Sequence, residues 1–186
     1  MSASAKIHLN TSAEYHYFSD DGIVPNSRLP VLIYRRAFDL NKLHVKERLR
    51  KVIEENGWTI RLVGDSVVST HLHYHSWAHE VLVALKGHAT LQIGGKKGRD
   101  IELNAGDAMA IPAGVAHKRL DKAENFTVAS LFLKGVHWNV CTDLPEPYKR
   151  AKKEIPRAKM PIADPIYGVD GPLMKYWAGL SRSVSA

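Results

Sequence analysis

Cysteine is almost absent from the sequence, since Cys141 is the only one among 186 residues. One thiol cannot form a disulfide within the chain, so we expect a protein of the reducing cytoplasm. The sequence also lacks any run of 18 apolar residues, and its first 18 residues contain no apolar core of a secretory signal. We therefore expect neither a membrane partner nor secretion. Internal repeats are absent too.

Acidic residues are fewer than basic ones, and the formal net charge is +7. Much of the excess lies in two segments, residues 42–51 and 149–159. Such segments can attract nucleic acid or an anionic substrate. No nucleic-acid-binding motif accompanies them, so we interpret them as two solvated basic faces and expect no nucleic-acid partner.

The first 57 residues show little regular pattern. Residues 1–30 contain the turn-forming groups Asp20-Asp21-Gly22 and Pro25-Asn26-Ser27, and we expect an irregular arm there. Residues 31–34 are apolar and predict a strand. Apolar residues at helical spacing predict an amphipathic helix over about 41–55, which Asn56-Gly57 would end.

Short β-prone segments dominate residues 58–141. They cover residues 59–63, 67–75, 80–85, 89–93, 101–103, 108–111 and 126–133, and glycine-rich turns separate them. Because no helical crossovers lie between them, the pattern predicts an antiparallel all-β barrel or sandwich.

The remaining residues, 142–186, hold six of the nine prolines. We expect a tail without regular structure apart from a helical turn at 148–153. The aromatic residues Tyr167, Tyr176 and Trp177 favour a tail docked on the barrel rather than a disordered one. The whole chain, 1–186, is then a single domain, with an arm, strand and helix over 1–57, the barrel over 58–141 and the tail over 142–186.

Histidine is the residue type that points to chemistry. Five of the ten histidines lie between positions 71 and 88. In a strand, His71, His73 and His75 would share one face, and three buried imidazoles need a partner such as a cation. A turn after His75 would bring Glu80 beside them, and the Pro112-Ala113-Gly114 turn would direct His117. Three imidazoles and one carboxylate suit a divalent transition metal, namely Fe, Mn, Ni, Co, Cu or Zn, and not Ca or Mg.

These residues resemble the two motifs of the cupin superfamily. The stretch from His73 through His75 and Glu80 to Gly87 resembles the first, HxH(x)3–4E(x)6G. The stretch from Gly106 to His117 resembles the second, G(x)5PxG(x)2H. The resemblance implies a cupin double-stranded β-helix, or jelly-roll barrel, with one metal ion held by His73, His75, Glu80 and His117.

The sequence departs from the cupin pattern at two positions. The opening glycine of the first motif is Val67, which leaves a bend in that strand in doubt. The closing asparagine of the second motif is Asp121, which can alter a loop hydrogen bond. Neither position holds a metal ligand in the family.

A closer resemblance, to the YjlB-type cupins, covers most of the chain. It is carried by residues 28–34, 80–82, 111–118 and 164–168. This second resemblance supports the fold and adds no chemistry.

Other residues are candidates for the surroundings of the site. His71 shares the expected inner face and is either a pocket residue or a plain lining residue. His79 precedes Glu80, so strand alternation points it away from the metal, although a turn could direct it inward. His88 and Gln92 alternate on one face, inner or outer. Trp77 and Trp138 are interpreted as packing residues, and Cys141 as an unreactive buried thiol.

Four protein ligands would leave two positions open on an octahedral ion. The resemblance therefore implies a metal-dependent oxygenase or isomerase that acts on a small oxygen-rich molecule. The alternative is a non-catalytic protein that senses or stores a small molecule or metal in the same cavity. A barrel with an extended arm offers free strand edges, so we expect a homodimer.

Overall fold

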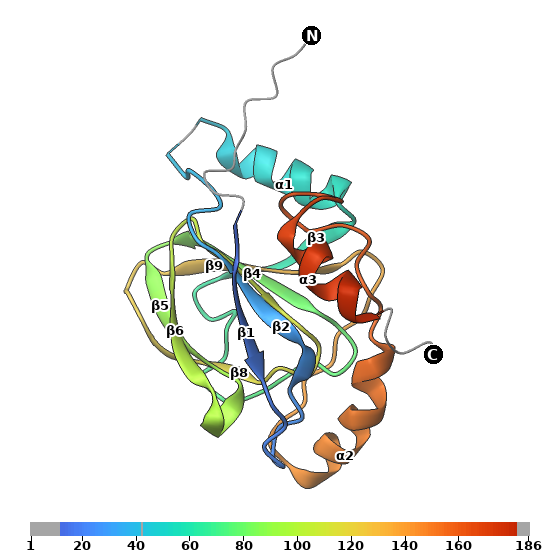
Figure 1. Cartoon of the computed structure of the whole chain (residues 1–186). Coiled ribbons are helices and arrows are strands. Elements are labelled where there is room, and N and C mark those ends of the chain that lie inside the picture. The colour runs from blue at the N-terminus through green and yellow to red at the C-terminus, as the bar shows by residue number, and fades with distance from the viewer. Residues whose placement is uncertain (1–11, 42, 182–186) are drawn as a thin grey trace.

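The computed structural model describes residues 12–41 and 43–181, with the side chains of 178–181 left out (Figure 1). Its strands are β1 Glu14–Phe18, β2 Ser27–Tyr34, β3 Trp58–Gly64, β4 Glu80–Lys86, β5 His88–Ile93, β6 Arg99–Asn104, β7 Ala108–Ile111, β8 His117–Lys122 and β9 Thr127–Leu133. The helices are α1 Val45–Glu55, α2 Pro145–Glu154 and α3 Pro172–Ser181, with short 3₁₀ turns η1 Gly95–Lys97 and η2 Ile155–Arg157.

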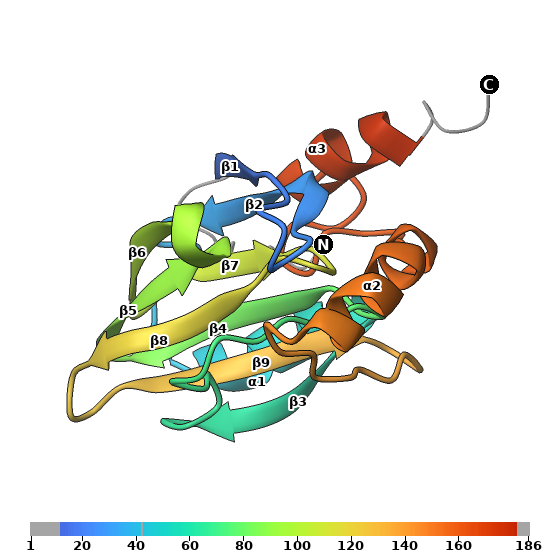
Figure 2. The same cartoon turned by 90° about the horizontal axis from the view of Figure 1, so that it is seen from below.

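The strands form two antiparallel sheets that face each other (Figure 2). The larger sheet has the order β1-β2-β7-β4-β9-β3, and the smaller has the order β6-β5-β8. Non-consecutive strands are neighbours in the larger sheet, as in a jelly roll. The expected all-β class is therefore confirmed.

Strand alternation gives the larger sheet two buried faces. On β4, Leu82 and Ala84 point between the two sheets, where they pack with Leu91 of the smaller sheet. Val81 and Val83 point the other way, into an outer core shared with α1 and α3. Because both faces of β4 are covered, its sequence is a continuous apolar run.

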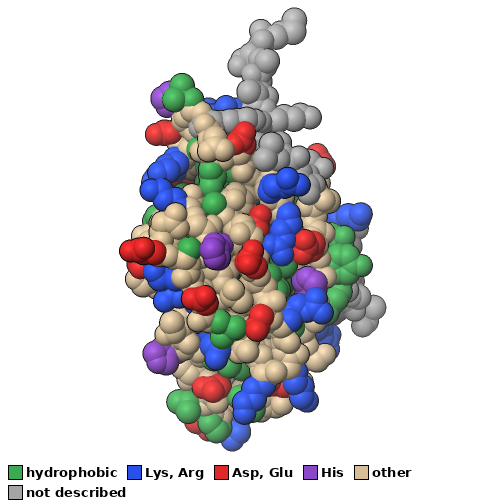
Figure 3. All heavy atoms as spheres, turned by 90° about the vertical axis from the view of Figure 1, so that its left-hand side faces the viewer, with side chains coloured by type: hydrophobic (Ala, Val, Ile, Leu, Met, Phe, Trp, Pro, Cys, Tyr) green, Lys and Arg blue, Asp and Glu red, His purple; other side chains and the backbone are tan. Residues whose placement is uncertain are grey.

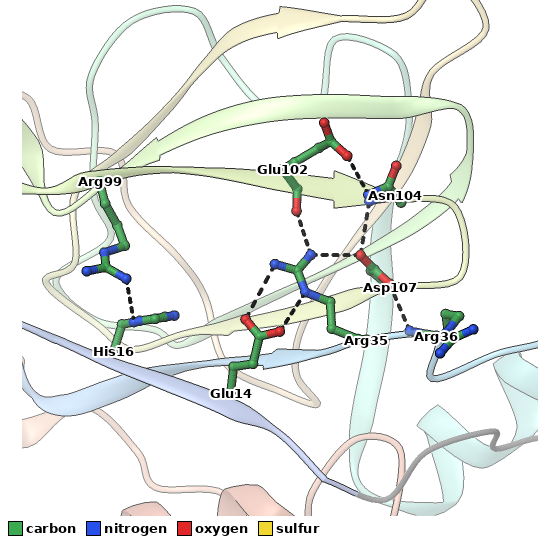
Figure 4. Close-up of polar contacts among 8 residues, drawn as sticks. All are labelled: Glu14, His16, Arg35, Arg36, Arg99, Glu102, Asn104 and Asp107. Atoms are coloured by element: carbon green, nitrogen blue, oxygen red, sulfur yellow. Dashed lines mark hydrogen bonds and ion pairs between the residues drawn. The ribbon is translucent and has the colours of Figure 1, made fainter.

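Side chains join the two sheets where β1 and β2 approach β6 (Figure 4). Arg35 lies just after β2, and its Nη1 donates to the Glu102 carbonyl oxygen at 2.6 Å and to Asp107 Oδ2 at 2.9 Å. Its Nε bonds Glu14 of β1 at 3.0 Å. The buried carboxylate of Asp107 also accepts the backbone N–H of Arg36 at 2.8 Å. A bidentate, partly buried arginine of this kind holds a sheet edge more firmly than an exposed ion pair.

Several expected elements differ from the structure. The arm expected to be irregular contains β1 and the start of β2. The strand expected at 67–75 is absent, and only His73 and Tyr74 form single bridges, to His117 and Cys141. The Ser69 hydroxyl accepts the backbone N–H of His71 at 3.0 Å, a local bond that competes with strand pairing.

Other differences lie further along the chain. β8 was not expected, because its sequence HKRLDK is polar, yet it pairs with β5 along its length. The helical turn expected at 148–153 is confirmed as part of α2, but the rest of the tail is more regular than expected, since it also forms α3. The N-terminal helix is confirmed over Val45–Glu55, and Gly57 follows it with φ of 79°. Residue 42 of the expected helix and residues 1–11 of the expected arm lie outside the described residues.

The surface on the side of β5 and β6 mixes charges of both signs (Figure 3). Lysine and arginine side chains lie among aspartate and glutamate side chains there, so this face carries no extended field of one sign. Among the described residues, no helix is both long and apolar enough to cross a membrane.

Asp164 organises the C-terminal segment against the larger sheet. Its buried Oδ2 accepts the Tyr34 hydroxyl at 2.8 Å and the backbone N–H of Leu173 at 2.9 Å, in the first turn of α3. Its Oδ1 accepts the backbone N–H groups of Ile166 and Tyr167 at 2.8 and 3.1 Å. One carboxylate thus connects β2, a turn and the N-terminus of α3, where an anion is favoured.

We predict that Asp164→Asn lowers the free energy of unfolding. An amide turns one acceptor oxygen into a donor, which would then face a backbone N–H or the Tyr34 hydroxyl without a partner. The expected loss is about 1–3 kcal/mol, measured by urea denaturation followed by tryptophan fluorescence. The exposed Asp170→Asn variant is the control and should lose little. Equal stability of the two variants would contradict the role of Asp164.

Candidate metal centre

The residues of the two motifs meet between the sheets at one end of the sandwich. Glu80 is the first residue of β4, and His117 is the first residue of β8. His73 and His75 lie on the irregular segment that precedes β4, and His73 exchanges backbone hydrogen bonds with His117 at 3.1 and 2.8 Å. The bridge brings the two motifs side by side.

Gly114 fixes the approach to His117. Its φ is 92°, and a Cβ atom there would lie 2.4 Å from the Asn26 carbonyl oxygen, so only glycine fits. Its N–H donates to the His75 carbonyl oxygen at 2.8 Å. The turn of the second motif is therefore hydrogen-bonded directly to the first.

The three imidazoles present the same ring nitrogen to a common point. Their Nδ1 atoms lie against backbone carbonyl oxygens, that of His73 against His71 at 3.0 Å, that of His117 against Val115 at 3.1 Å, and that of His75 against Asn139. A carbonyl only accepts, so each Nδ1 carries the proton and each Nε2 offers a lone pair. The candidate ligand atoms of the triad lie within 4.8 Å of one another.

Glu80 adds a buried carboxylate to these nitrogens. Its Oε2 lies 3.3 Å from Nε2 of His75 and 3.1 Å from Nε2 of His117. The Ser130 hydroxyl donates to the other oxygen, Oε1, at 2.5 Å. With Nδ1 protonated on both rings, Oε2 faces two lone pairs and has no hydrogen-bond donor. Such an arrangement requires a proton or a metal cation between the oxygen and the nitrogens.

The pKa values respond to these contacts. Burial alone would raise the pKa of Glu80, but the contacts with His117 and His75 outweigh it and hold the pKa well below its usual range. Burial, assisted by His117, lowers the pKa of His73 to about 4. Burial also acts to lower the pKa of His75, but the hydrogen bond and charge of Glu80 outweigh it and raise that pKa above its ordinary value. Glu80 is therefore ionised in the metal-free site, and His75 holds a second proton more readily than a free imidazole does.

The donor set fits a metal ion. Three neutral Nε2 atoms and one carboxylate oxygen are the ligands preferred by borderline divalent transition metals. Each imidazole already has its Nδ1 hydrogen bond to a carbonyl, which is the usual support of metal-binding histidines. The Phe132 ring packs edge-on against His75 at 5.5 Å and contributes an apolar wall.

The other expected residues surround the site or lie away from it. The His71 side chain is exposed and does not share an inner face with His73, although its carbonyl supports that ligand. His88 is exposed and Gln92 is half-buried, both on the face of β5 opposite to its buried residues, so neither lines the space between the sheets.

His79 points into the outer core, away from Glu80. Its Nδ1 accepts the backbone N–H of Ala113 at 3.0 Å, and its ring packs against Trp177 at 4.8 Å. Trp138 stacks on Phe132 at 4.6 Å, whereas Trp77 is about half exposed, at 49%. Cys141 is buried.

Two polar residues at the site were not expected from the sequence. Ser130 interrupts the apolar run of β9 at a position facing Glu80, and a lone hydroxyl in such a run is the signal that could have identified it. Asn139 supports His75 through its backbone. No sequence signal indicates that contact, because it joins residues 64 positions apart.

Comparison with known sequences places these residues in a family. The sequence profile of the cupin domain matches residues 63–120, which include all four candidate ligands. The uncharacterized protein YjlB of Bacillus subtilis (strain 168) is 38% identical over 170 residues, which are 91% of this chain and 99% of that protein.

Solved structures give only partial overlaps. QdtA, a sugar 3,4-ketoisomerase from Thermoanaerobacterium thermosaccharolyticum in complex with TDP, aligns with a TM-score of 0.39 and 20% identity, over 51% of this chain and 75% of that one. Acireductone dioxygenase from Bacillus anthracis, with a cadmium ion in its active centre, aligns with a TM-score of 0.31 and 19% identity, over 61% and 54% of the two chains. Overlaps of this extent carry no information on the reaction. The match to YjlB along nearly its whole length, together with the cupin profile, establishes that the chain belongs to the YjlB family of cupins.

Proposed function

We propose that the protein binds one divalent transition metal ion through His73, His75, Glu80 and His117. The observation that carries the proposal is the buried Glu80 oxygen that faces two imidazole lone pairs at 3.1 and 3.3 Å. A metal cation satisfies all of these groups together, whereas a single proton satisfies one pair of them at a time.

The proposed activity is that of a metal-dependent enzyme, of the oxygenase or isomerase class, that acts on a small oxygen-rich molecule. A bound metal would supply Lewis acidity or activate dioxygen. The chain itself would hold the imidazoles in one tautomer, keep Glu80 ionised and exclude water from one side with Phe132.

We also propose that the protein is cytoplasmic and forms a homodimer. Within residues 12–41 and 43–181, β1 and β3 are the edges of the larger sheet. These edges, with the half-exposed Tyr15 and Tyr17 on β1, are surfaces on which a second copy could pair.

Metal analysis of protein purified from its native source tests the metal proposal first, because recombinant metal content follows intrinsic affinity more than biology. Dioxygen consumption by the iron(II) form with candidate oxygen-rich substrates then indicates an oxygenase. Turnover without oxygen by the manganese or zinc form indicates an isomerase. A protein that binds metal and substrate but turns over neither way is the non-catalytic alternative.

Removal of metal is predicted to destabilise the fold. The ligands meet only in the folded chain, so metal binds the native state selectively. At free metal 100 times above the dissociation constant, the free energy of unfolding should rise by about 2.7 kcal/mol. Thermal melting with and without chelator measures this difference. Identical melting curves across a series of divalent metals would contradict the proposed site.

Glu80→Gln is predicted to weaken metal binding strongly, while His79→Ala leaves the affinity near that of the wild type. The amide removes the only anionic ligand, whereas His79 contacts Ala113 and Trp177 in the outer core. His79→Ala should instead lower the free energy of unfolding, because it leaves a cavity. Titration of both variants with Co²⁺ decides the matter. Loss of Co²⁺ binding in His79→Ala, with intact binding in Glu80→Gln, would show that Glu80 is not the ligand.

Metal binding is predicted to release protons at mildly acidic pH, with a contribution from His75. His75, whose pKa is raised, must lose a proton to bind metal, whereas His73, with a pKa of about 4, is already neutral. Affinity should therefore fall by about tenfold per pH unit below the pKa of His75. Calorimetry at pH 6 in buffers of different ionisation enthalpy counts the protons.

The Glu80→Gln variant is the control for this proton. Without the carboxylate, burial outweighs the remaining contact with the Asn139 carbonyl and lowers the pKa of His75, so proton release at pH 6 should be smaller than in the wild type. Equal proton release by the wild type and the variant would contradict the assignment.

A further inference from the structure

His75 differs from the other two histidines of the centre in how its ring is held. Nδ1 of His73 and of His117 bonds a carbonyl two residues earlier on its own segment. Nδ1 of His75 bonds the carbonyl of Asn139, 64 residues later in the chain. The orientation and tautomer of His75 therefore depend on tertiary placement of Asn139.

The Asn139 side chain fixes that placement. Its Oδ1 accepts the backbone N–H groups of Ser76 at 3.0 Å and Trp77 at 3.3 Å, directly after His75. Its Nδ2 donates to the Ser76 hydroxyl at 2.7 Å and to Cys141 Sγ at 3.2 Å. Three of these four bonds link Asn139 to the segment of His75, and the fourth, to Cys141, stays within the segment of Asn139. The segment of His75 is outside any strand and has few ladder bonds of its own.

Helix α2 completes the same network. The buried Ser76 hydroxyl donates to Glu154 Oε2 at 2.5 Å, and the other oxygen of Glu154 lies 3.3 Å from Arg150 Nε. Ser76 thus accepts from Asn139 and donates to Glu154, so both of its hydroxyl roles are used. Because Glu154 can only accept, Ser76 must donate to it, and the Asn139 amide must then donate to Ser76. The direction of each hydrogen bond between α2 and the His75 segment is thus determined.

We propose that Asn139 is a positioning residue of the metal centre, which holds His75 in the Nδ1–H tautomer with Nε2 directed at the ion. The proposal rests on the metal site proposed above. Loss of a group that supports a metal-binding histidine typically lowers metal affinity by about 10–100-fold. The part played by Asn139 comes from its side chain, because that side chain locates the accepting carbonyl.

The test compares Asn139→Ala, Asn139→Asp and Asn56→Ala in the full-length protein. Aspartate retains the oxygen that accepts from Ser76 and Trp77 but loses the donor to the Ser76 hydroxyl, so it is a partial rescue that tests the two accepting bonds alone. Asn56 donates to the Pro165 carbonyl at 3.2 Å at the end of α1, so its replacement reports general loss of a tertiary hydrogen bond. Two readouts are used. The first is Co²⁺ affinity by titration at a temperature where every variant is folded. The second is the His75 tautomer in metal-free protein at pH 8, from side-chain nitrogen NMR.

We expect Asn139→Ala to weaken Co²⁺ binding by about 10–100-fold and to give His75 a mixture of tautomers. Asn139→Asp, which keeps the two accepting bonds, should recover part of the affinity and of the Nδ1–H form. Asn56→Ala should melt at a lower temperature with unchanged affinity and tautomer. The proposal is overturned if Asn139→Ala keeps the wild-type tautomer, or if Asn56→Ala weakens Co²⁺ binding equally.

The two readouts separate this proposal from the metal proposal itself. If the wild type binds no Co²⁺, the proposed metal site is wrong, while the tautomer of metal-free His75 still tests Asn139. If the wild type binds Co²⁺ and the tautomer does not respond to Asn139→Ala, the metal site stands and the positioning role is wrong.

Discussion

The structure depends on one buried carboxylate that needs a cation. Glu80 is 5% exposed, accepts one hydroxyl from Ser130, and points its second oxygen at His75 and His117. An ionised carboxylate in such surroundings is stable only when positive charge lies beside it. The pairing of two imidazoles with this oxygen, together with their Nδ1 hydrogen bonds to carbonyl oxygens, is the basis on which we propose a cation site in the interior of the sandwich.

The position of that carboxylate follows from the two faces of β4. Glu80 shares the inner face with Leu82, whereas His79 shares the outer face with Val81 and packs on Trp177 of α3. Two cores therefore fix the backbone at the start of β4 from opposite sides. This packing holds the Glu80 carboxylate in a buried position, where removing a charged group from water costs the most free energy.

The sequence was sufficient for the features that depend on local pattern. The short β-prone segments between glycine-rich turns predicted most strands. The motif spacing singled out His73, His75, Glu80 and His117, whose side chains lie close together in the structure. The prediction of strands failed where a side-chain hydrogen bond competes with strand pairing, as at Ser69. It also failed where a polar segment forms a strand by pairing with a neighbouring strand, as β8 does with β5. The support of His75 by Asn139 joins distant segments, which no local pattern indicates.

The two halves of the site differ in rigidity. Glu80 and Ser130 lie on β4 and β9, which are central strands paired on both sides. His73 and His75 lie on an irregular segment held by single bridges and by the bonds of Asn139. Local opening requires least free energy where few ladder bonds must break. The placement of His73 and His75 therefore depends on the bridge to His117 and on the bonds of Asn139 more than on a strand ladder, whereas that of Glu80 depends on the ladders of β4.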